Sequence, residues 1–253
     1  MKLLNYINSF RQMRRNTEEL VWAEIFHDAV RGSEWLEHGS LSLCPGRMAV
    51  GYNYLYPMFR ILDEFRPRNI LEMGLGQSSK MIARYAGSKV AGENCKYTII
   101  EHDKEWSSFF QKRNPLPSCA TIKNCDLEVR SYSYGGKKCQ AYQYNANQFD
   151  TILNTSINGG GYDLISIDAP FGSDVLSPYV FSRVDIVRHI PNCLAESFCI
   201  IIDDYERKGE RNTAIAIMSE LKKAGIKYCN TGYFGIKGTA VIVSENLKFL
   251  CSL

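Results

Sequence analysis

The fold of this chain is decided by the stretch Asn69-Ile-Leu-Glu-Met-Gly-Leu-Gly-Gln-Ser78. Its first five residues are a short, mostly apolar run typical of a buried strand, and a helical pattern runs from Ser78 to Tyr85. Between them, Gly74 and Gly76 permit a tight turn and leave the backbone open to a ligand, because neither carries a Cβ. On its own this GxG pair is weak evidence, since an ordinary strand–helix turn contains the same residues.

Short apolar strands and helices continue to alternate toward the C-terminus. Further strands are expected at 96–101, 120–123, 163–168, 198–203 and 239–243, with a weaker one near 227–233. This alternation predicts an α/β fold with a mostly parallel sheet covered on both faces, and the last two strands predict a C-terminal antiparallel hairpin. The polar, tyrosine-rich residues 127–147, with Gly135-Gly136 as the turn, are expected to form a hairpin insertion.

The N-terminal part of the chain is predicted to be helical. One helix is expected to begin at Asn16-Thr17-Glu18-Glu19 and to end at Arg31-Gly32, and a second is expected at 52–65. Both are expected to pack on or cover the α/β domain. We therefore divide the sequence into an N-terminal helical extension or lid, 1–66, and a Rossmann-like domain, 67–253. The apolar face expected for the first helix consists of Leu20, Val21, Ala23, Ile25, Phe26 and Val30.

Composition narrows the class of protein. The chain has 253 residues, 45% hydrophobic and 23% charged, as is typical of a globular domain. Its net charge of +3 and the lack of a basic stripe argue against a nucleic-acid partner. The nine cysteines match no zinc pattern, so we expect reduced thiols in a cytoplasmic protein. No stretch approaches a signal peptide or a membrane span.

Acidic residues end or follow four of the predicted strands. In a parallel α/β sheet, ligands bind beyond the carboxyl ends of the strands, so these residues are the first candidates for a site. A carboxylate at the tip of the second strand can accept hydrogen bonds from both hydroxyls of a ribose. The residues at these strand ends are Glu72, Glu101, Asp168, and Asp203-Asp204 followed by Tyr205.

These motifs, in this order, resemble the class I S-adenosylmethionine (SAM)-dependent methyltransferases. The resemblance covers about residues 69–243 and includes the C-terminal hairpin. It rests on the E-x-G-x-G loop of Glu72, Gly74 and Gly76, and on Glu101 and Asp168. It implies a seven-stranded Rossmann-like sheet, SAM as the cofactor and methyl transfer as the reaction.

The same resemblance implies roles for individual residues. The glycine loop, with Ser78, lies under the methionine part of SAM, and Glu101 holds the ribose. Asp126 lies near the adenine, and Asp168 also borders the cofactor. Trp106 is expected either beside the adenine or in the core, and Arg47 is expected to reach the cleft from the extension.

Three other interpretations stay open. A nicotinamide dehydrogenase needs Gly or Ala at the third position of its GxGxxG fingerprint, where this chain has Ser79. Aminopropyl transfer of the spermidine-synthase kind uses a similar fold and is harder to exclude. A non-catalytic SAM-binding protein would keep the fold without turnover.

Two resemblances disagree about a metal. Asp168, Asp203 and Asp204 are expected to meet where two neighbouring strands end, and such a cluster suits Mg²⁺. The pattern resembles the metal-dependent sugar and catechol O-methyltransferases, especially the macrolide-sugar type, although Ala169-Pro170 replaces their further metal-site motif. Asp168-Ala-Pro-Phe-Gly172, with the later Arg183, also resembles the glucuronoxylan O-methyltransferases, which lack that metal cluster. Both resemblances imply a carbohydrate hydroxyl as the acceptor.

A hydroxyl acceptor must lose a proton to a base or a metal. Asp168, Asp204 and His102 are the candidate catalytic residues. We expect Arg183, Arg207 and Tyr205 to contact the substrate, which the arginines suggest is anionic, such as a uronate, a phosphate or a nucleotide sugar. The expected function is O-methylation of a sugar or other small polar acceptor, in cell-surface polysaccharide or secondary metabolism. The methylated atom does not follow from the sequence, nor does the oligomeric state, for which a homo-oligomer is one option.

Overall fold

The computed structural model describes residues 2–37, 41–45, 49–134, 136–157, 160–171 and 180–252. Its main feature is a seven-stranded sheet of order β3-β2-β1-β6-β7-β9-β8, in which β8 and β9 form an antiparallel hairpin and the other strands are parallel. The expected Rossmann-like fold is therefore confirmed. The strands are β1 (Asn69–Met73), β2 (Lys96–Glu101), β3 (Ala120–Asn124), β6 (Tyr162–Ile167), β7 (Leu194–Asp203), β8 (Tyr228–Phe234) and β9 (Gly238–Ser244).

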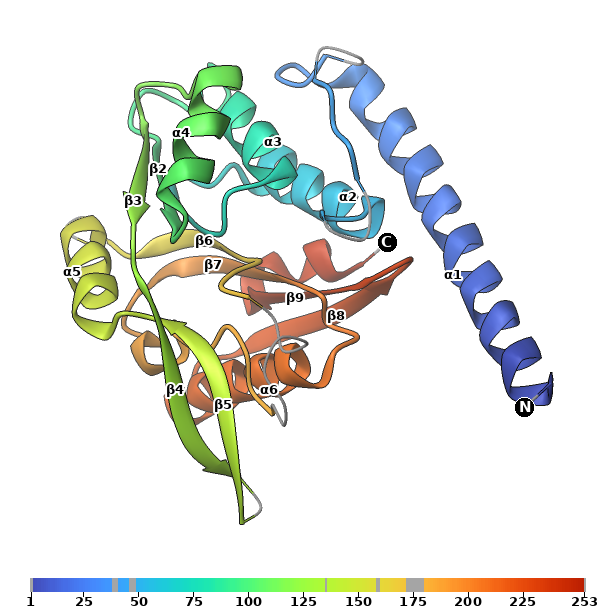
Figure 1. Ribbon diagram of the computed structural model, residues 1–253. Helices are drawn as coiled ribbons and strands as arrows, with labels where there is room; N and C mark the ends of the chain where they lie inside the picture. The colour runs from blue at the N-terminus through green and yellow to red at the C-terminus, as the bar shows by residue number, and fades with distance from the viewer. Residues whose placement is uncertain are drawn as a thin grey trace.

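Helices cover both faces of the sheet (Figure 1). Side chains of α2 (Tyr52–Arg60), α3 (Gln77–Ala86) and α4 (Lys104–Arg113) share one apolar cluster with residues of the sheet. Side chains of α5 (Ala146–Ile157) and α6 (Lys208–Lys223) share a second cluster on the other face. Because both faces are buried, the central strands are continuously apolar, as in Ile200-Ile201-Ile202 of β7.

The second predicted helix, 52–65, corresponds to α2 and a π-helical turn, Ile61–Phe65, that ends at Arg66 in the left-handed conformation. Three short 3-10 turns, Val30–Gly32, Val187–His189 and Glu245–Cys251, complete the helical elements among the described residues. No helix in the described ranges has the length and apolar character needed to cross a membrane.

The first helix differs from its prediction. α1 spans Lys2–Ala29, so the start expected at Asn16 is wrong. The capping signal there is overridden because residues 2–15 contain neither proline nor glycine to end the helix. Phe26 and Val30 of the expected apolar face are buried, but Leu20 is 71% exposed and Val21 is 54% exposed.

A buried acid holds α1 on the domain instead. Glu19 is 8% exposed, and its carboxylate accepts hydrogen bonds from the backbone N–H of Tyr52, the first residue of α2 (2.5 Å), and of Ile236 (3.1 Å). A carboxylate at a helix N-terminus is favourable because it meets the positive end of the helix dipole. Nearby, the indole of Trp22 donates to the carbonyl oxygen of Phe234 (2.8 Å). Polar contacts that a hydrophobic pattern does not reveal thus orient the helix.

The insertion expected at 127–147 is a hairpin of β4 (Leu127–Tyr134) and β5 (Lys137–Tyr144), which confirms that prediction; Gly135 of its expected turn lies outside the described residues. The two strands form a separate sheet that extends away from the main one (Figure 1). At the base of the hairpin, the buried carboxylate of Asp185 accepts a hydrogen bond from the Tyr144 N–H (2.8 Å).

Candidate functional site

The glycine turn lies at the carboxyl edge of the sheet, between β1 and α3. Gly74 has a φ of 104°, which favours glycine, and a Cβ on it would lie 2.9 Å from the Cβ of Ala169. A Cβ on Gly76 would meet no described atom within 4 Å. Backbone conformation and packing therefore require glycine at Gly74, whereas Gly76 faces open space where a ligand can approach the chain.

Glu72 and Ser78 lie behind this turn. Glu72 is fully buried, and its two carboxylate oxygens accept hydrogen bonds from the Ser78 hydroxyl (2.6 Å) and the Tyr97 hydroxyl. Burial raises the pKa of Glu72 to about 7, although both hydrogen bonds act to lower it. In this arrangement Glu72 and Ser78 position the turn, and their expected contact with a cofactor stays a prediction.

Glu101 ends β2 beside the glycine turn. Its Oε2 accepts a hydrogen bond from the Leu75 N–H (3.0 Å), and its Oε1 accepts from the N–H groups of His102 (2.7 Å) and Asp103 (2.9 Å). Burial alone would raise the pKa of Glu101, but the contact of the His102 ring with its carboxylate (Nδ1 to Oε1, 2.8 Å) and the bonds from the Asp103 and Leu75 N–H groups outweigh it and lower the pKa. The carboxylate is therefore ionised, and Oε2 retains an acceptor site for a hydroxyl. To hold both ribose hydroxyls, Oε1 must exchange one of its donors.

Aromatic side chains surround this corner. The indole of Trp106 donates to the carbonyl oxygen of Leu75 (2.8 Å) and is 39% exposed, so Trp106 lies beside the turn and not in the core. His102 packs edge-on against Phe171, with ring centroids 4.8 Å apart, and Phe171 also contacts Tyr142 of β5 at 5.6 Å. The described contacts thus join His102 to Glu101 and to this aromatic group.

The three predicted aspartates meet where β6 and β7 end. Asp168 follows β6, Asp203 is the last residue of β7, and Ile167 pairs with Ile202 in the parallel register. One oxygen from each of Asp168, Asp203 and Asp204 lies within 4.8 Å of the others. The expectation that these carboxylates gather at neighbouring strand ends is confirmed.

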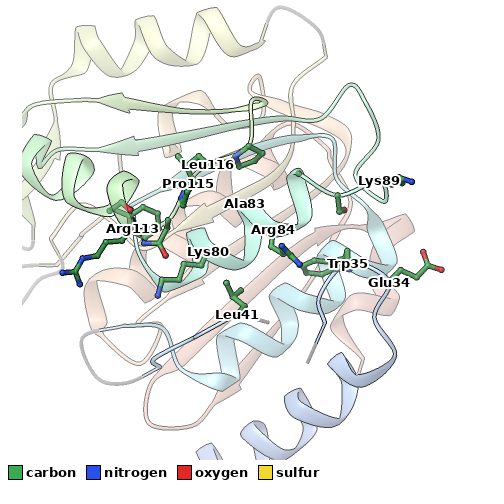
Figure 2. Close-up of a pocket in the computed structure, with 15 residues that line it drawn as sticks. Glu34, Trp35, Leu41, Lys80, Ala83, Arg84, Lys89, Arg113, Pro115 and Leu116 are labelled. Atoms are coloured by element: carbon green, nitrogen blue, oxygen red, sulfur yellow. Dashed lines mark hydrogen bonds between the residues drawn. The ribbon is translucent and has the colours of Figure 1, made fainter. Parts of the chain in front are cut away.

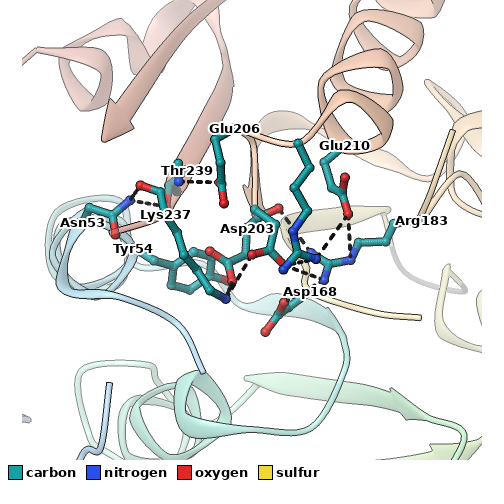
Figure 3. Close-up of polar contacts among 12 residues, drawn as sticks. Asn53, Tyr54, Asp168, Arg183, Asp203, Glu206, Glu210, Lys237 and Thr239 are labelled. Atoms are coloured by element: carbon teal, nitrogen blue, oxygen red, sulfur yellow. Dashed lines mark hydrogen bonds and ion pairs between the residues drawn. The ribbon is translucent and has the colours of Figure 1, made fainter. Parts of the chain in front are cut away.

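Two basic side chains approach the carboxylates from opposite sides (Figure 3). Lys237 Nζ lies 2.7 Å from Asp203 Oδ2 and 3.1 Å from Asp204 Oδ1. Arg183 Nη2 lies 2.9 Å from Asp204 Oδ2 and 3.2 Å from Asp168 Oδ1. Four of these five side chains are almost completely buried, so water is excluded from the ion pairs among them; the exception is Asp168.

Arg183 and Arg207 differ in burial and in the number of protein groups that their guanidinium groups contact. Arg183 also donates to the carbonyl oxygens of Pro170 (3.3 Å) and Asp203 (3.2 Å), so its guanidinium is committed to the cluster. Arg207 lies 3.1 Å from Asp204 Oδ2, but 26% of its side chain is exposed. Of the two arginines expected to meet a substrate, Arg207 is the better placed. Both roles stay predictions.

The cluster raises the pKa of two of the carboxylates and lowers the pKa of the third. Burial raises the pKa of Asp203 well above its usual value, and the charge of Asp168 adds to this effect. Burial also raises the pKa of Asp168, against the opposing effects of Arg183 and Lys237. For Asp204, Arg183 and Lys237 outweigh burial, and the pKa is lowered. The cations thus favour the ionised form of Asp204, burial disfavours the charged form of Asp203, and Asp168, with 26% of its side chain exposed, is the carboxylate that a ligand can reach.

Backbone strain marks both halves of the central ion pair. Arg183 has a φ of 58° and Asp204 a φ of 59°. Such left-handed conformations cost non-glycine residues roughly 1–3 kcal/mol and gather at functional sites. The buried ion pair holds both residues in this conformation.

The cluster does not fit Mg²⁺ as arranged. Magnesium requires a near-octahedral shell of oxygen ligands. Here, Lys237 lies against Asp203 and Asp204, and Arg183 lies against Asp204 and Asp168, so an added cation would be repelled by the protein's own cations. The metal role expected for these aspartates is not supported.

Other predicted site residues lie at the margins. Tyr205 packs near Phe234, with ring centroids 6.3 Å apart. Asp126 is 60% exposed and accepts a hydrogen bond from the Gln148 amide (2.8 Å). Arg47 and Gly172 lie outside the described residues. The roles of Tyr205 and Asp126 stay predictions.

Sequence reasoning missed Lys237 and Glu210. Lys237 lies in the β8–β9 turn, and the pairing of Asp203 with Thr239 brings that turn to the end of β7. Glu210 is fully buried on α6, 4.0 Å from Arg183 and 3.9 Å from Arg207. A lysine in the hairpin that follows an Asp-Asp strand end was the available signal for Lys237.

A groove of about 690 Å³ lies elsewhere, on the outer side of α3 (Figure 2). Its lining includes residues 87–89, which lead into β2, and residues 115–117, which lead into β3. It therefore opens toward the amino ends of the strands, away from the glycine turn and the aspartates. Its basic lining residues are Lys80, Arg84, Lys89 and Arg113.

Neither a protein-family model nor a curated protein matches this chain. Solved structures do align with it, at low identity. Fibrillarin from Aeropyrum pernix, in complex with natively bound S-adenosyl-L-methionine, is 10% identical over 70% of this chain and 66% of its own, with a TM-score of 0.43.

Two other matches are of the same kind. Precorrin-6y C5,15-methyltransferase from Geobacter metallireducens is 8% identical over 83% of this chain and 97% of its own, with a TM-score of 0.45. Spermidine synthase from Thermotoga maritima is 10% identical over 78% of this chain and 62% of its own, also with a TM-score of 0.45. Likeness at this level says nothing about the substrate or the reaction of this chain.

Proposed function

We propose that this protein is a SAM-dependent methyltransferase. The observation that carries the proposal is the pairing of Gly76, which faces open space, with Glu101, an ionised carboxylate at the end of the adjacent strand. The glycine turn would lie under the methionine part of SAM, and Glu101 would accept a hydrogen bond from the ribose. When bound, SAM supplies an electrophilic methyl group.

The proposed acceptor group is a hydroxyl, with Asp168 as the base. Methyl transfer is an in-line displacement, so the protein mainly aligns the acceptor with the methyl group. Asp168 is accessible, and its raised pKa makes it a better base near neutral pH than an ordinary aspartate. Asp204 is a poorer base, because Arg183 and Lys237 stabilise its ionised form and so lower its pKa. Asp203, Lys237 and Arg183 are proposed to hold Asp168 in place.

The proposed acceptor is a sugar or another small polar molecule. Phe171 is 50% exposed and lies between His102 and Tyr142, so it offers an aromatic face to a ring. The partly exposed Arg207 suits an anionic group such as a uronate. A role in polysaccharide or secondary metabolism rests on the resemblance of the Asp168-Ala-Pro-Phe-Gly172 segment alone.

Calorimetric titration with four ligands tests the cofactor. We expect the protein to bind SAM and S-adenosylhomocysteine and not NAD⁺. Preferential binding of decarboxylated SAM would instead indicate aminopropyl transfer, and binding of NAD⁺ alone would contradict the proposal. For the reaction, Asp168→Asn should retain SAM binding and lose methyl transfer to uronate-containing oligosaccharides. Asp28→Asn, on α1 and with 77% of its side chain exposed, provides a control of the same chemistry.

A further inference from the structure

The surface of α1 is unusually apolar for a helix on the outside of a protein. Seven of its large apolar side chains are between 37% and 73% exposed, which is half of all the large apolar side chains exposed among the described residues. Large contiguous apolar patches on a surface usually mark an interface. The seven are Tyr6, Ile7, Phe10, Met13, Leu20, Val21 and Ile25.

These side chains share one face of the helix. At about 100° per residue, the seven positions fall within one stripe, and the packed residues Glu19, Phe26 and Val30 lie on the opposite side. Tyr6, Phe10, Met13 and Leu20 follow the alternating spacing of four and three seen in the seam of a coiled coil, with the polar Thr17 at the fourth position of the series. α1 lies at the outer edge of the molecule (Figure 1). Because the side chains of the stripe are exposed, α1 can contact another helix through them without disturbing its own packing.

We propose that α1 pairs with α1 of a second copy of this chain, in antiparallel orientation. The charges along the helix favour this partner. Residues 6–17 contain three arginines and no acid, whereas residues 18–29 contain four acids and no lysine or arginine. An antiparallel pair places the basic half of each helix against the acidic half of its partner, and a two-fold axis relates the two contacts. The charged residues are Arg11, Arg14 and Arg15 in one half and Glu18, Glu24 and Asp28 in the other; Glu18 is partly buried and pairs with Arg14 within the helix (2.8 Å), and the five residues other than Glu18 are exposed.

The available area suits a stable dimer. An aromatic side chain has on the order of 200 Å² to bury, and the aliphatic ones have less. Seven side chains at these exposures therefore offer at most roughly 700–800 Å² per copy, which approaches the about 800 Å² per partner of a specific interface. An anionic membrane fits less well, because the acidic half of the helix also carries exposed Leu20, Val21 and Ile25.

Sedimentation velocity at micromolar concentration tests the pairing. The wild-type chain should be a dimer, and Phe10→Glu/Leu20→Glu should be a folded monomer, because both side chains are exposed and neither packs on the domain. The matched control is Asn8→Glu/Gln12→Glu, which adds the same charge to the side of α1 away from the stripe and should leave the dimer intact. Circular dichroism of each variant checks that the fold is retained.

Charge reversal tests the orientation. Arg11→Glu/Arg14→Glu/Arg15→Glu should raise the dimer dissociation constant at least about tenfold, since acid then faces acid in an antiparallel pair. A parallel pair would be unaffected, because like charges face each other before and after the change. Mixing this variant with Glu18→Lys/Glu24→Lys/Asp28→Lys should restore a dimer.

Three results would overturn the proposal. They are a wild-type monomer, a dimer that survives Phe10→Glu/Leu20→Glu, and a monomer that binds phosphatidylglycerol vesicles through the same stripe. None of these measurements depends on SAM. The dimer can therefore be disproved while the proposed function holds, and the proposed function can be disproved while the dimer holds.

Discussion

Replacing Lys237 with methionine is the change that most directly probes the buried charge cluster. Lys237 is 6% exposed, and its ammonium contacts both Asp203 (2.7 Å) and Asp204 (3.1 Å). Removing one partner from a buried ion pair typically costs about 3–5 kcal/mol, because the remaining charge loses its compensation. We expect the lower end, about 3 kcal/mol at pH 7, because Asp203 can relieve part of the cost by taking up a proton once Lys237 is removed.

Urea denaturation followed by circular dichroism measures this loss. With an m-value of about 3 kcal/mol/M, a change of about 3 kcal/mol lowers the midpoint by about 1 M. Lys227→Met is the matched control, since Lys227 is 82% exposed and lies 3.7 Å from Glu245. An exposed pair of this kind is worth at most about 1 kcal/mol. Equal midpoints for the two variants would refute the reasoning.

The pH dependence of the difference provides a second check. The lowered pKa of Asp204 contributes stability that is present above its unfolded pKa, about 3.9, and is lost as the pH falls through its folded value. Lys237→Met removes one of the cations that lower this pKa. The difference in stability between wild type and variant should therefore be complete at pH 7 and shrink below about pH 4. A difference that grows on acidification would contradict the assignment.

Three further predictions concern the glycine turn, Glu72 and the metal. Gly74→Ala should lower the melting temperature, because Gly74 has a φ of 104° and the added Cβ would lie too close to Ala169. Gly76→Val should leave the melting temperature unchanged and abolish SAM binding in calorimetry. Because burial raises the pKa of Glu72 to about 7, the folded state binds the extra proton, so stability should fall as the pH rises from about 4.5 to 7. Glu72→Gln should flatten that part of the pH profile in urea titrations. Methyl transfer should be insensitive to EDTA and to added Mg²⁺, and a loss of activity restored by Mg²⁺ would contradict the structure of the cluster.

The sequence predicts those parts of the fold in which local pattern and burial agree. The run Asn69–Met73 and the isoleucines of β7 are apolar because both faces of the sheet are covered, so their strands are recognisable without a structure. α1 is different, because Glu19 and Trp22 hold its packed face beside Phe26, while seven of its large apolar side chains point outward. A hydrophobic pattern therefore identifies the wrong face of this helix.

The sequence predicts where the carboxylates of the candidate site gather, but not the lysine that pairs with them. Residues that end parallel strands must share one edge, so Asp168, Asp203 and Asp204 were expected to meet. Their partner Lys237 comes from a turn 34 positions after Asp203, so the only signal for it is its place in the hairpin that follows the Asp-Asp strand end, which is not a local pattern. A cluster of carboxylates predicts a metal only when the protein supplies no cation of its own, and here Lys237 and Arg183 supply two.

The affinity of Glu101→Gln for SAM tests the central claim most directly. Each hydrogen bond to a charged group contributes about 1.5–3 kcal/mol, so losing the carboxylate should raise the dissociation constant about 10- to 100-fold. The exposed Glu105→Gln, four residues on, should bind SAM like the wild type, and the melting temperatures of the two variants show whether the turn is intact. If a folded Glu101→Gln binds SAM as tightly as the wild type does, the nucleoside site is not at this strand end.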